Sequence, residues 1–240
     1  MRNIFVIAKR ELNSYFVSPV AYVAAAMYLV IAGIIFVFNV NQMGQGAPVS
    51  LQYQFSTMVF LWLFFAPPVT MRLLAEEQRM GTLELLLTSP VNDWEVVVGK
   101  FLGSLAVLLL TIVITFTYGW VLKVLGNADL GPMAVGYLGL FLTGAAIMSI
   151  GVLASALTQN QVIAVLLAFA ITLTLWVLSG LGQVVGGLAT TQVFTQLAFF
   201  DHTDNFWRGV IDTNDIVYFV SLIALALFIA TRVLETRRWR

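Results

Sequence analysis

Long stretches without a single charged residue are the feature that most limits how this chain can fold. Leu12–Met71 spans 60 residues, Phe101–Leu122 spans 22 and Leu130–Phe200 spans 71, all without Asp, Glu, Lys or Arg. Only 10% of the residues are charged, whereas a soluble domain carries about 25%. A membrane span needs about 20 mostly apolar residues. The sequence therefore predicts an all-α, polytopic membrane protein with one domain, residues 1–240.

Turn-forming residues divide the apolar stretches into six predicted spans. These cover residues 19–40, 55–74, 96–125, 132–157, 162–181 and 216–233. Pro67 and Pro68 should bend the second span or end it early, because proline has no amide donor. Asn92 and Glu95 have capping-box spacing ahead of the third span. Only residues 158–161 separate the fourth and fifth spans, which predicts an antiparallel hairpin.

The distribution of Lys and Arg predicts the orientation, because positive residues tend to stay on the cytoplasmic side. Six spans place both termini on one side of the membrane. Ten of the twelve basic residues fall on that side, namely Arg2, Lys9, Arg10, Arg72, Arg79, Lys100, Arg232, Arg237, Arg238 and Arg240. Lys123 and Arg208 fall on the other side. We therefore expect cytoplasmic termini in the inner (cytoplasmic) membrane of the cell.

The first 17 residues are predicted to form an interfacial helix. Ile4, Ala8, Leu12 and Phe16 share one helical face, as in helices that lie along a membrane surface. The apolar stretch after it is longer than the core of a signal peptide, which favours its retention on the mature chain.

The charged residues avoid the deep parts of the predicted spans. Ion-coupled carriers and intramembrane enzymes usually keep ionisable groups there, so both classes are disfavoured. The chain has no cysteine and one histidine, His202, which gives no thiolate nucleophile and no metal site. Its net charge of zero provides no field for nucleic acid. Any work that this protein does should be driven from outside the chain.

The cytoplasmic segment 72–92 concentrates charge between the second and third spans. Met80, Leu83 and Leu87 recur at helical spacing. Glu76, Glu77, Arg79 and Glu84 flank them. Such a helix either docks a cytoplasmic partner or lies on membrane lipid. The acidic residues favour docking, because the inner leaflet is itself negative.

The same segment resembles a known family, the type 2 permeases of ATP-binding-cassette (ABC) transporters. Residues 77–91, EQRMGTLELLLTSPV, are similar to the family motif E-x-R-x-G-T-x-E-x-L-L-x-x-P. Residues 10–19, 205–212 and 232–238 extend the resemblance toward the gliding-motility-type permease subfamily. One departure is Gln159, where this resemblance leads us to expect Glu.

The resemblance implies a type 2 ABC exporter permease fold and a set of partners. Two six-span permeases, identical or different, pair with two ATPase subunits that bind the ATP and magnesium. The segment between the second and third spans acts as the coupling helix, with Gly81 allowing a sharp turn. The residues implied for ATPase coupling are Glu76, Glu77, Arg79, Met80, Gly81, Thr82, Leu83, Glu84, Leu87, Gln159 and Asn160. The chain has no G-x-x-x-x-G-K-[ST] loop, so it is not expected to hydrolyse ATP or to bind a cofactor of its own.

Three functions remain open on the sequence. The first is export of a lipid-like, amphipathic or polymeric cargo, driven by the partner ATPase. The second is an ATP-driven mechanical relay or scaffold that acts on an extracytoplasmic accessory protein. The third and least favoured is a membrane-embedded enzyme built on Asp201, His202 and Asp204.

Two further features leave their roles open. The extracytoplasmic connection, residues 183–215, is expected to form an interfacial or re-entrant helical turn, or a solvated loop with aromatic anchors. Small residues four apart allow helices to approach closely, within one subunit or between two. The pairs are Gly99 with Gly103, Gly151 with Ser155, and Gly182 with Gly186.

Overall fold

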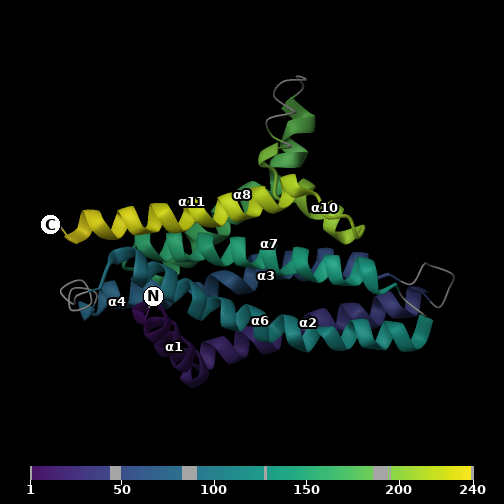
Figure 1. Ribbon diagram of the computed structural model, residues 1–240, viewed down its shortest axis with the longest axis horizontal. Coiled ribbons are helices and arrows are strands. Elements are labelled where there is room, and N and C mark those ends of the chain that lie inside the picture. Colours follow the sequence, from purple (N-terminus) through teal and green to yellow (C-terminus); the bar gives the residue numbers. More distant parts are fainter. Residues whose placement is uncertain are drawn as a thin grey trace.

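A computed structural model describes residues 2–43, 50–82, 91–126, 129–185, 194 and 196–238 (Figure 1). These residues form helices and no strands. The helices are α1 (Arg2–Val17), α2 (Pro19–Met43), α3 (Gln52–Thr70), α4 (Arg72–Arg79), α6 (Asp93–Gly126), α7 (Leu130–Leu157), α8 (Gln161–Val185), α10 (Asp201–Trp207) and α11 (Thr213–Arg238). Six helical segments of the described chain are long and apolar enough to cross a membrane. The predicted all-α, six-span fold is confirmed.

α7 is the central helix, and small residues allow its neighbours to approach it. It packs against α3, α6, α8, α10 and α11. A Cβ added at Gly136 would lie 2.2 Å from the Phe55 ring of α3, and one at Gly144 would lie 2.5 Å from a methyl group of Leu108 in α6. Close approach through small residues is how membrane helices gain packing energy. The glycines of α7 therefore set the distances within the bundle.

The second span, Gln52–Arg79, runs through Pro67 and Pro68 and is divided into α3 and α4 only at Met71, so the early end suggested by the prolines is not seen. α3 passes through both prolines and stops at Thr70, and α4 begins at Arg72. The Thr70 hydroxyl donates to the Ala66 carbonyl at 3.0 Å, and the Met71 amide donates to the Pro67 carbonyl at 2.9 Å. These bonds hold the last turn of α3 together at its junction with α4.

The third span begins in the predicted place, and one half of its capping box forms. The Glu95 carboxylate accepts a hydrogen bond from the Asn92 amide at 3.2 Å. The same carboxylate accepts one from the Asn3 side chain of α1 at 3.1 Å. The start of α6 is thus fixed both locally and by α1, which crosses its first turns (Figure 1).

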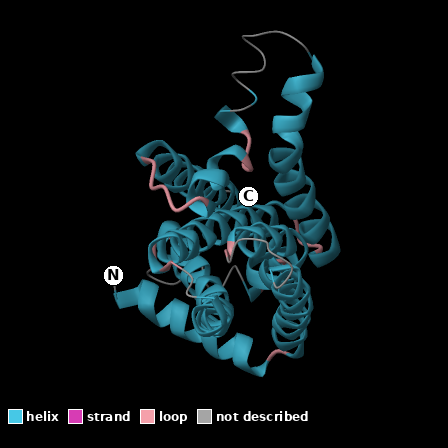
Figure 2. Cartoon of the chain, turned by 90° about the vertical axis from the view of Figure 1, so that its right-hand side faces the viewer, coloured by secondary structure: helices cyan, strands magenta, loops and turns pink. Residues whose placement is uncertain are grey.

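Both described ends of the chain lie at one end of the bundle, together with α4, whereas α10 lies toward the other (Figure 1). We call these the α4 end and the α10 end. The C-terminal part of α8 rises away from the other helices in both views (Figure 1, Figure 2). α2, α8 and α11 are the least buried of the six spans. Their outer faces are apolar, which is expected where lipid or a second subunit covers a helix.

Candidate functional site

The Ser155 hydroxyl of α7 binds the first turn of α4. The first amides of a helix have no partners within it. The Ser155 hydroxyl accepts hydrogen bonds from the Leu74 amide at 3.0 Å and the Ala75 amide at 2.9 Å. It donates to the Met71 carbonyl at 2.8 Å. Ser155 therefore caps α4 from a neighbouring helix, and the Gly151–Ser155 pair works within this chain.

The hairpin between α7 and α8 lies beside α4. The Gln78 side chain donates to the Ala156 carbonyl at 3.0 Å. Asn160 caps α8, since its side-chain oxygen accepts from the Val162 amide at 2.9 Å. Gln159 and Asn160 are both exposed. The structure thus brings the two predicted contact regions, α4 and the hairpin, to one surface.

The tip of this surface is the chain that follows α4. Arg79, Met80, Gly81 and Thr82 are all exposed, and Met80 keeps 60% of its surface free. Gly81 has a positive φ of 71°, a conformation that glycine adopts without strain. The chain turns at Gly81, so Met80 lies just after the last residue of α4 and not within that helix. Leu83, Glu84 and Leu87 lie outside the described residues.

Glu77 points inward, toward a group of charged side chains from three helices. Its Oε1 lies 2.9 Å from Lys100 Nζ of α6 and 2.7 Å from Arg10 Nη2 of α1. Lys100 Nζ also lies 2.6 Å from Glu11 Oε1. We call Arg10, Glu11, Glu77 and Lys100 the charge cluster. It carries two positive and two negative charges, and it borders a cavity of about 260 Å³.

Lys100 shows how a charged residue is accommodated near the end of a predicted span. It is the eighth residue of α6, inside the predicted third span, and only 1% of it is exposed. A charged side chain therefore does enter a predicted span, close to its end. It can do so because two carboxylates meet its ammonium group, as a buried charge requires.

Three further hydrogen bonds, from two side chains, join the end of α1 and Ser18 to the junction between α3 and α4. The Arg72 guanidinium donates to the hydroxyl groups of Ser14 and Ser18. The Tyr15 hydroxyl donates to the Val69 carbonyl at 2.9 Å. Burial, with a smaller effect of the Glu11 charge, raises the pKa of the Tyr15 phenol.

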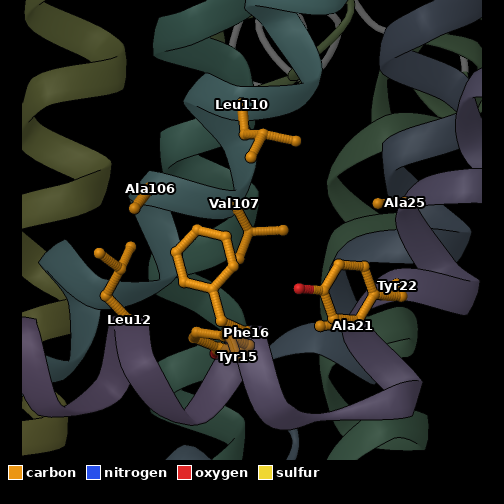
Figure 3. A pocket seen from close by; sticks show the side chains of 9 residues that line it. All are labelled: Leu12, Tyr15, Phe16, Ala21, Tyr22, Ala25, Ala106, Val107 and Leu110. Carbon is orange, nitrogen blue, oxygen red and sulfur yellow. The ribbon is translucent and has the colours of Figure 1, made fainter.

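The junction of α1 and α2 encloses an apolar groove against α6 (Figure 3). The Phe16 ring points from α1 into the space between α6 and Tyr22 of α2. The side chains that line the groove are Leu12, Tyr15, Phe16, Ala21, Tyr22, Ala25, Ala106, Val107 and Leu110. α1 thus contacts the bundle through charged residues on one side and apolar residues on another.

At the α10 end, the described part of the connection 183–215 folds back onto the bundle. α10 packs on α7, where a Cβ at Gly139 would lie 2.5 Å from Phe206. His202 Nδ1 lies 2.7 Å from Asp215 Oδ1, and Asn205 donates to Asp215 Oδ2 at 2.8 Å. Residues 186–193 and 195 lie outside the described chain. α10 is helical, and whether this connection is interfacial, re-entrant or solvated stays a prediction.

Asp201 lies beside this group of polar residues. Burial, with a smaller contribution from the Asp204 charge, raises the pKa of the Asp201 carboxyl, and the neighbouring His202 lowers it. Within the part of the chain that the structure describes, no three His, Cys, Asp or Glu side chains are grouped as metal ligands.

Gly81→Ala tests the turn at the tip. A Cβ at Gly81 would meet nothing within 4 Å, so the substitution acts through the positive φ alone. We expect a cost of about 1 kcal/mol, or about fivefold faster amide exchange in residues 76–82. Gly180→Ala is the matched control, because its Cβ also enters open space but without a positive φ. Equal exchange in both variants would contradict the role of the turn.

Comparison with known proteins identifies the family. No curated protein matches the chain. The family model described as "ABC-2 family transporter protein" matches residues 16–237, which covers almost the entire six-span fold described above. This chain therefore belongs to the ABC-2 family of transporter proteins.

Proposed function

We propose that this chain is the permease subunit of an ABC exporter and that its α4 end receives force from an ATPase subunit. The observation that carries the proposal is the contrast within one segment. Residues 79–82 are exposed, whereas Leu73, Leu74 and Ala75 are buried against the bundle. A segment that is free at its tip and fixed at its base can transmit a push into the helices behind it.

The exposed tip has the chemistry of a docking surface. Met80 offers an apolar side chain that can fill a groove, and Arg79 offers a charge that can form hydrogen bonds with a carboxylate. Gln159 and Asn160 add amide groups beside it. Leu83, Glu84 and Leu87 belong to the same proposed contact. The ATPase subunits, two per complex, supply ATP and magnesium binding.

A second permease subunit completes the proposed complex. Phe60 and Phe64 of α3 contact each other with ring centroids 5.3 Å apart, and both are more than 40% exposed. Phe169 and Trp176 of α8 contact the same pair of rings. This aromatic face, on the second and fifth spans, suits an interface that opens and closes. The partner is either a copy of this chain or a different permease.

The proposed cargo follows from the position of the charged residues. α2, α3, α7 and α8 contain none, and those of α6 and α11 fall within the first or last eight residues of their helices. A path lined by such helices suits a lipid-like, amphipathic or polymeric molecule better than a small ion. The proposed orientation has cytoplasmic termini in the inner membrane, and membership of the gliding-motility-type subfamily belongs to the same proposal.

The docking role is tested by Arg79→Glu combined with Met80→Asp. The first change reverses an exposed charge, and the second places a charge where an apolar contact is expected. We expect at least a tenfold weaker affinity, about 1.4 kcal/mol, for a purified ABC ATPase from the same organism, titrated in detergent. Lys123→Glu is the control, since it reverses an exposed charge in the last turn of α6. Unchanged affinity in the double variant would contradict docking at the tip.

Transport and mechanical relay are separated by a different measurement. Vesicles that contain both permease and ATPase subunits should move a labelled amphipathic cargo in an ATP-dependent way. ATP hydrolysis that depends on the permease, without movement of any cargo across the vesicle membrane, would favour the relay.

A further inference from the structure

The charge cluster connects three helices that are far apart in the sequence. Glu11 lies in α1, Glu77 in α4 and Lys100 in α6, and the two carboxylates meet at one ammonium group. Arg10 Nη2 reaches both carboxylates, at 2.7 Å from Glu77 and 3.5 Å from Glu11. Removing one partner of a buried ion pair strongly destabilises a protein, because the remaining charge is left uncompensated. The three helices are therefore held together by shared ion pairs, and moving one helix away would leave a charge on another helix without its partner.

The packing around Lys100 explains how α1 comes so close to α6. A Cβ at Gly99 would lie 2.8 Å from Ile7, and one at Gly103 would lie 2.5 Å from the Cβ of Glu11. The two glycines on either side of Lys100 thus leave room for α1 to lie directly on α6. The Gly99–Gly103 pair serves this contact within the chain, and it brings Glu11 to the Lys100 ammonium group.

α1 also leads directly into α2. Only Ser18 separates Val17, the last residue of α1, from Pro19, the first of α2. The Ser18 hydroxyl accepts a hydrogen bond from Arg72 of α4. α2 is one of the least buried spans, with 28% of its most apolar window buried against 78% for α7. A movement of α1 would therefore meet less resistance in α2 than in the centre of the bundle.

We infer that Lys100 is a positioning residue that joins α4, the first part of the coupling segment (residues 72–92), to α1. A movement imposed on α4 then reaches the first span, α2, through α1. This inference rests on the proposed function for the source of the movement. The joining of α1, α4 and α6 rests on the charge cluster alone. Lys100 itself contacts neither ATPase nor cargo.

The joining is tested first on the free permease by hydrogen exchange. Lys100→Met keeps an unbranched side chain one atom shorter than lysine and removes its charge. Arg10 is then the only member of the charge cluster left to pair with Glu11 and Glu77. We expect amide exchange in residues 2–17 and 72–79 to accelerate at least tenfold, while residues 140–156 of α7 stay unchanged. Lys100→Arg should stay within threefold of the wild type. Lys9→Met, the same change at an exposed position of α1, should have no effect.

The transmission is tested on the permease–ATPase complex with spin labels. The chain has no cysteine, so labels at Asn13→Cys in α1 and Thr236→Cys in α11, both exposed, need no other change. We expect a non-hydrolysable ATP analogue to shift the distance between the labels in the wild type. Lys100→Met should lose at least half of this shift, while its affinity for the ATPase stays within twofold. Glu11→Gln, a milder change that leaves the Glu77–Lys100 pair intact, should show the same loss.

The outcomes separate the inference from the proposed function. A full shift in Lys100→Met and Glu11→Gln would overturn the inference, as would unchanged exchange in residues 2–17. No shift in the wild type despite tight ATPase binding would also overturn it and leave docking intact. Failure of the wild type to bind the ATPase would overturn the proposed function, and the exchange experiment would still decide whether Lys100 joins the helices.

Discussion

Ser155→Ala is expected to release the first turn of α4 and to destabilise the protein by about 2–4 kcal/mol. The substitution removes the acceptor of the Leu74 and Ala75 amides and the donor to the Met71 carbonyl. Leu74, Ala75 and Ser155 are all buried. Each buried group left without a partner costs about 1–3 kcal/mol. Both thermal unfolding in detergent and amide exchange in residues 72–79 should report the loss.

Ser149→Ala is the matched control for this prediction. Ser149 is buried in the same helix, but its hydroxyl donates only to the Ala146 carbonyl one turn earlier. That carbonyl is also available to the helix backbone, so we expect a loss below about 1 kcal/mol. If the two alanine variants unfold at the same temperature, Ser155 does not cap α4. In the complex, Ser155→Ala should also reduce ATPase coupling, because a loosened base transmits less force.

The features that the sequence predicted correctly depend on neighbouring residues. Six spans follow from the apolar stretches, and half of the capping box at the start of α6 follows from the spacing of Asn92 and Glu95. The turn at Gly81 follows from the freedom of glycine at positive φ. In each case the residues that decide the structure lie within one or two helical turns of it.

The contacts that sequence reasoning missed join distant residues. Lys100 pairs with Glu11, which lies 89 positions away, and Ser155 caps an amide 81 positions away. No helical periodicity relates such positions. The charge pattern of the coupling segment is the same whether Glu77 points toward a partner or toward Lys100. Only the packing of α1 on α6 decides that Glu77 points inward, so its proposed role changes from docking to holding the segment.

One signal in the sequence could have suggested the charge cluster. Gly99 and Gly103 flank a single lysine near the end of an apolar span, and they indicate that another helix lies close to that lysine. A lysine buried at such a contact needs a carboxylate nearby. The acidic residues of the first 17 positions and of the coupling segment were the candidates, and Glu11 and Glu77 prove to be the partners.

Gly151→Ala should cause a second large loss, because Thr70, the last residue of α3, packs directly on this position. The new Cβ would lie 2.0 Å from the Thr70 hydroxyl oxygen and 2.7 Å from the Thr70 Cβ. Thr70 cannot easily turn aside, since its hydroxyl bonds to carbonyls within α3 and its side chain is fully buried. Overpacking of this kind costs about 1–3 kcal/mol, which corresponds to about 2–4 °C of thermal stability per kcal/mol in a protein of this size.

A double-variant cycle shows whether the clash is the cause. Thr70→Ala removes the oxygen and the methyl group nearest to the new side chain but keeps Cβ, so it should relieve part of the strain. The combined variant Gly151→Ala, Thr70→Ala is therefore expected to lose less stability than the sum of the two single changes. Gly180→Ala, where the added carbon meets nothing within 4 Å, should leave the unfolding temperature unchanged. Strictly additive losses would mean that Gly151 acts through some contact other than Thr70, and the packing of α3 on α7 would not then depend on this close approach.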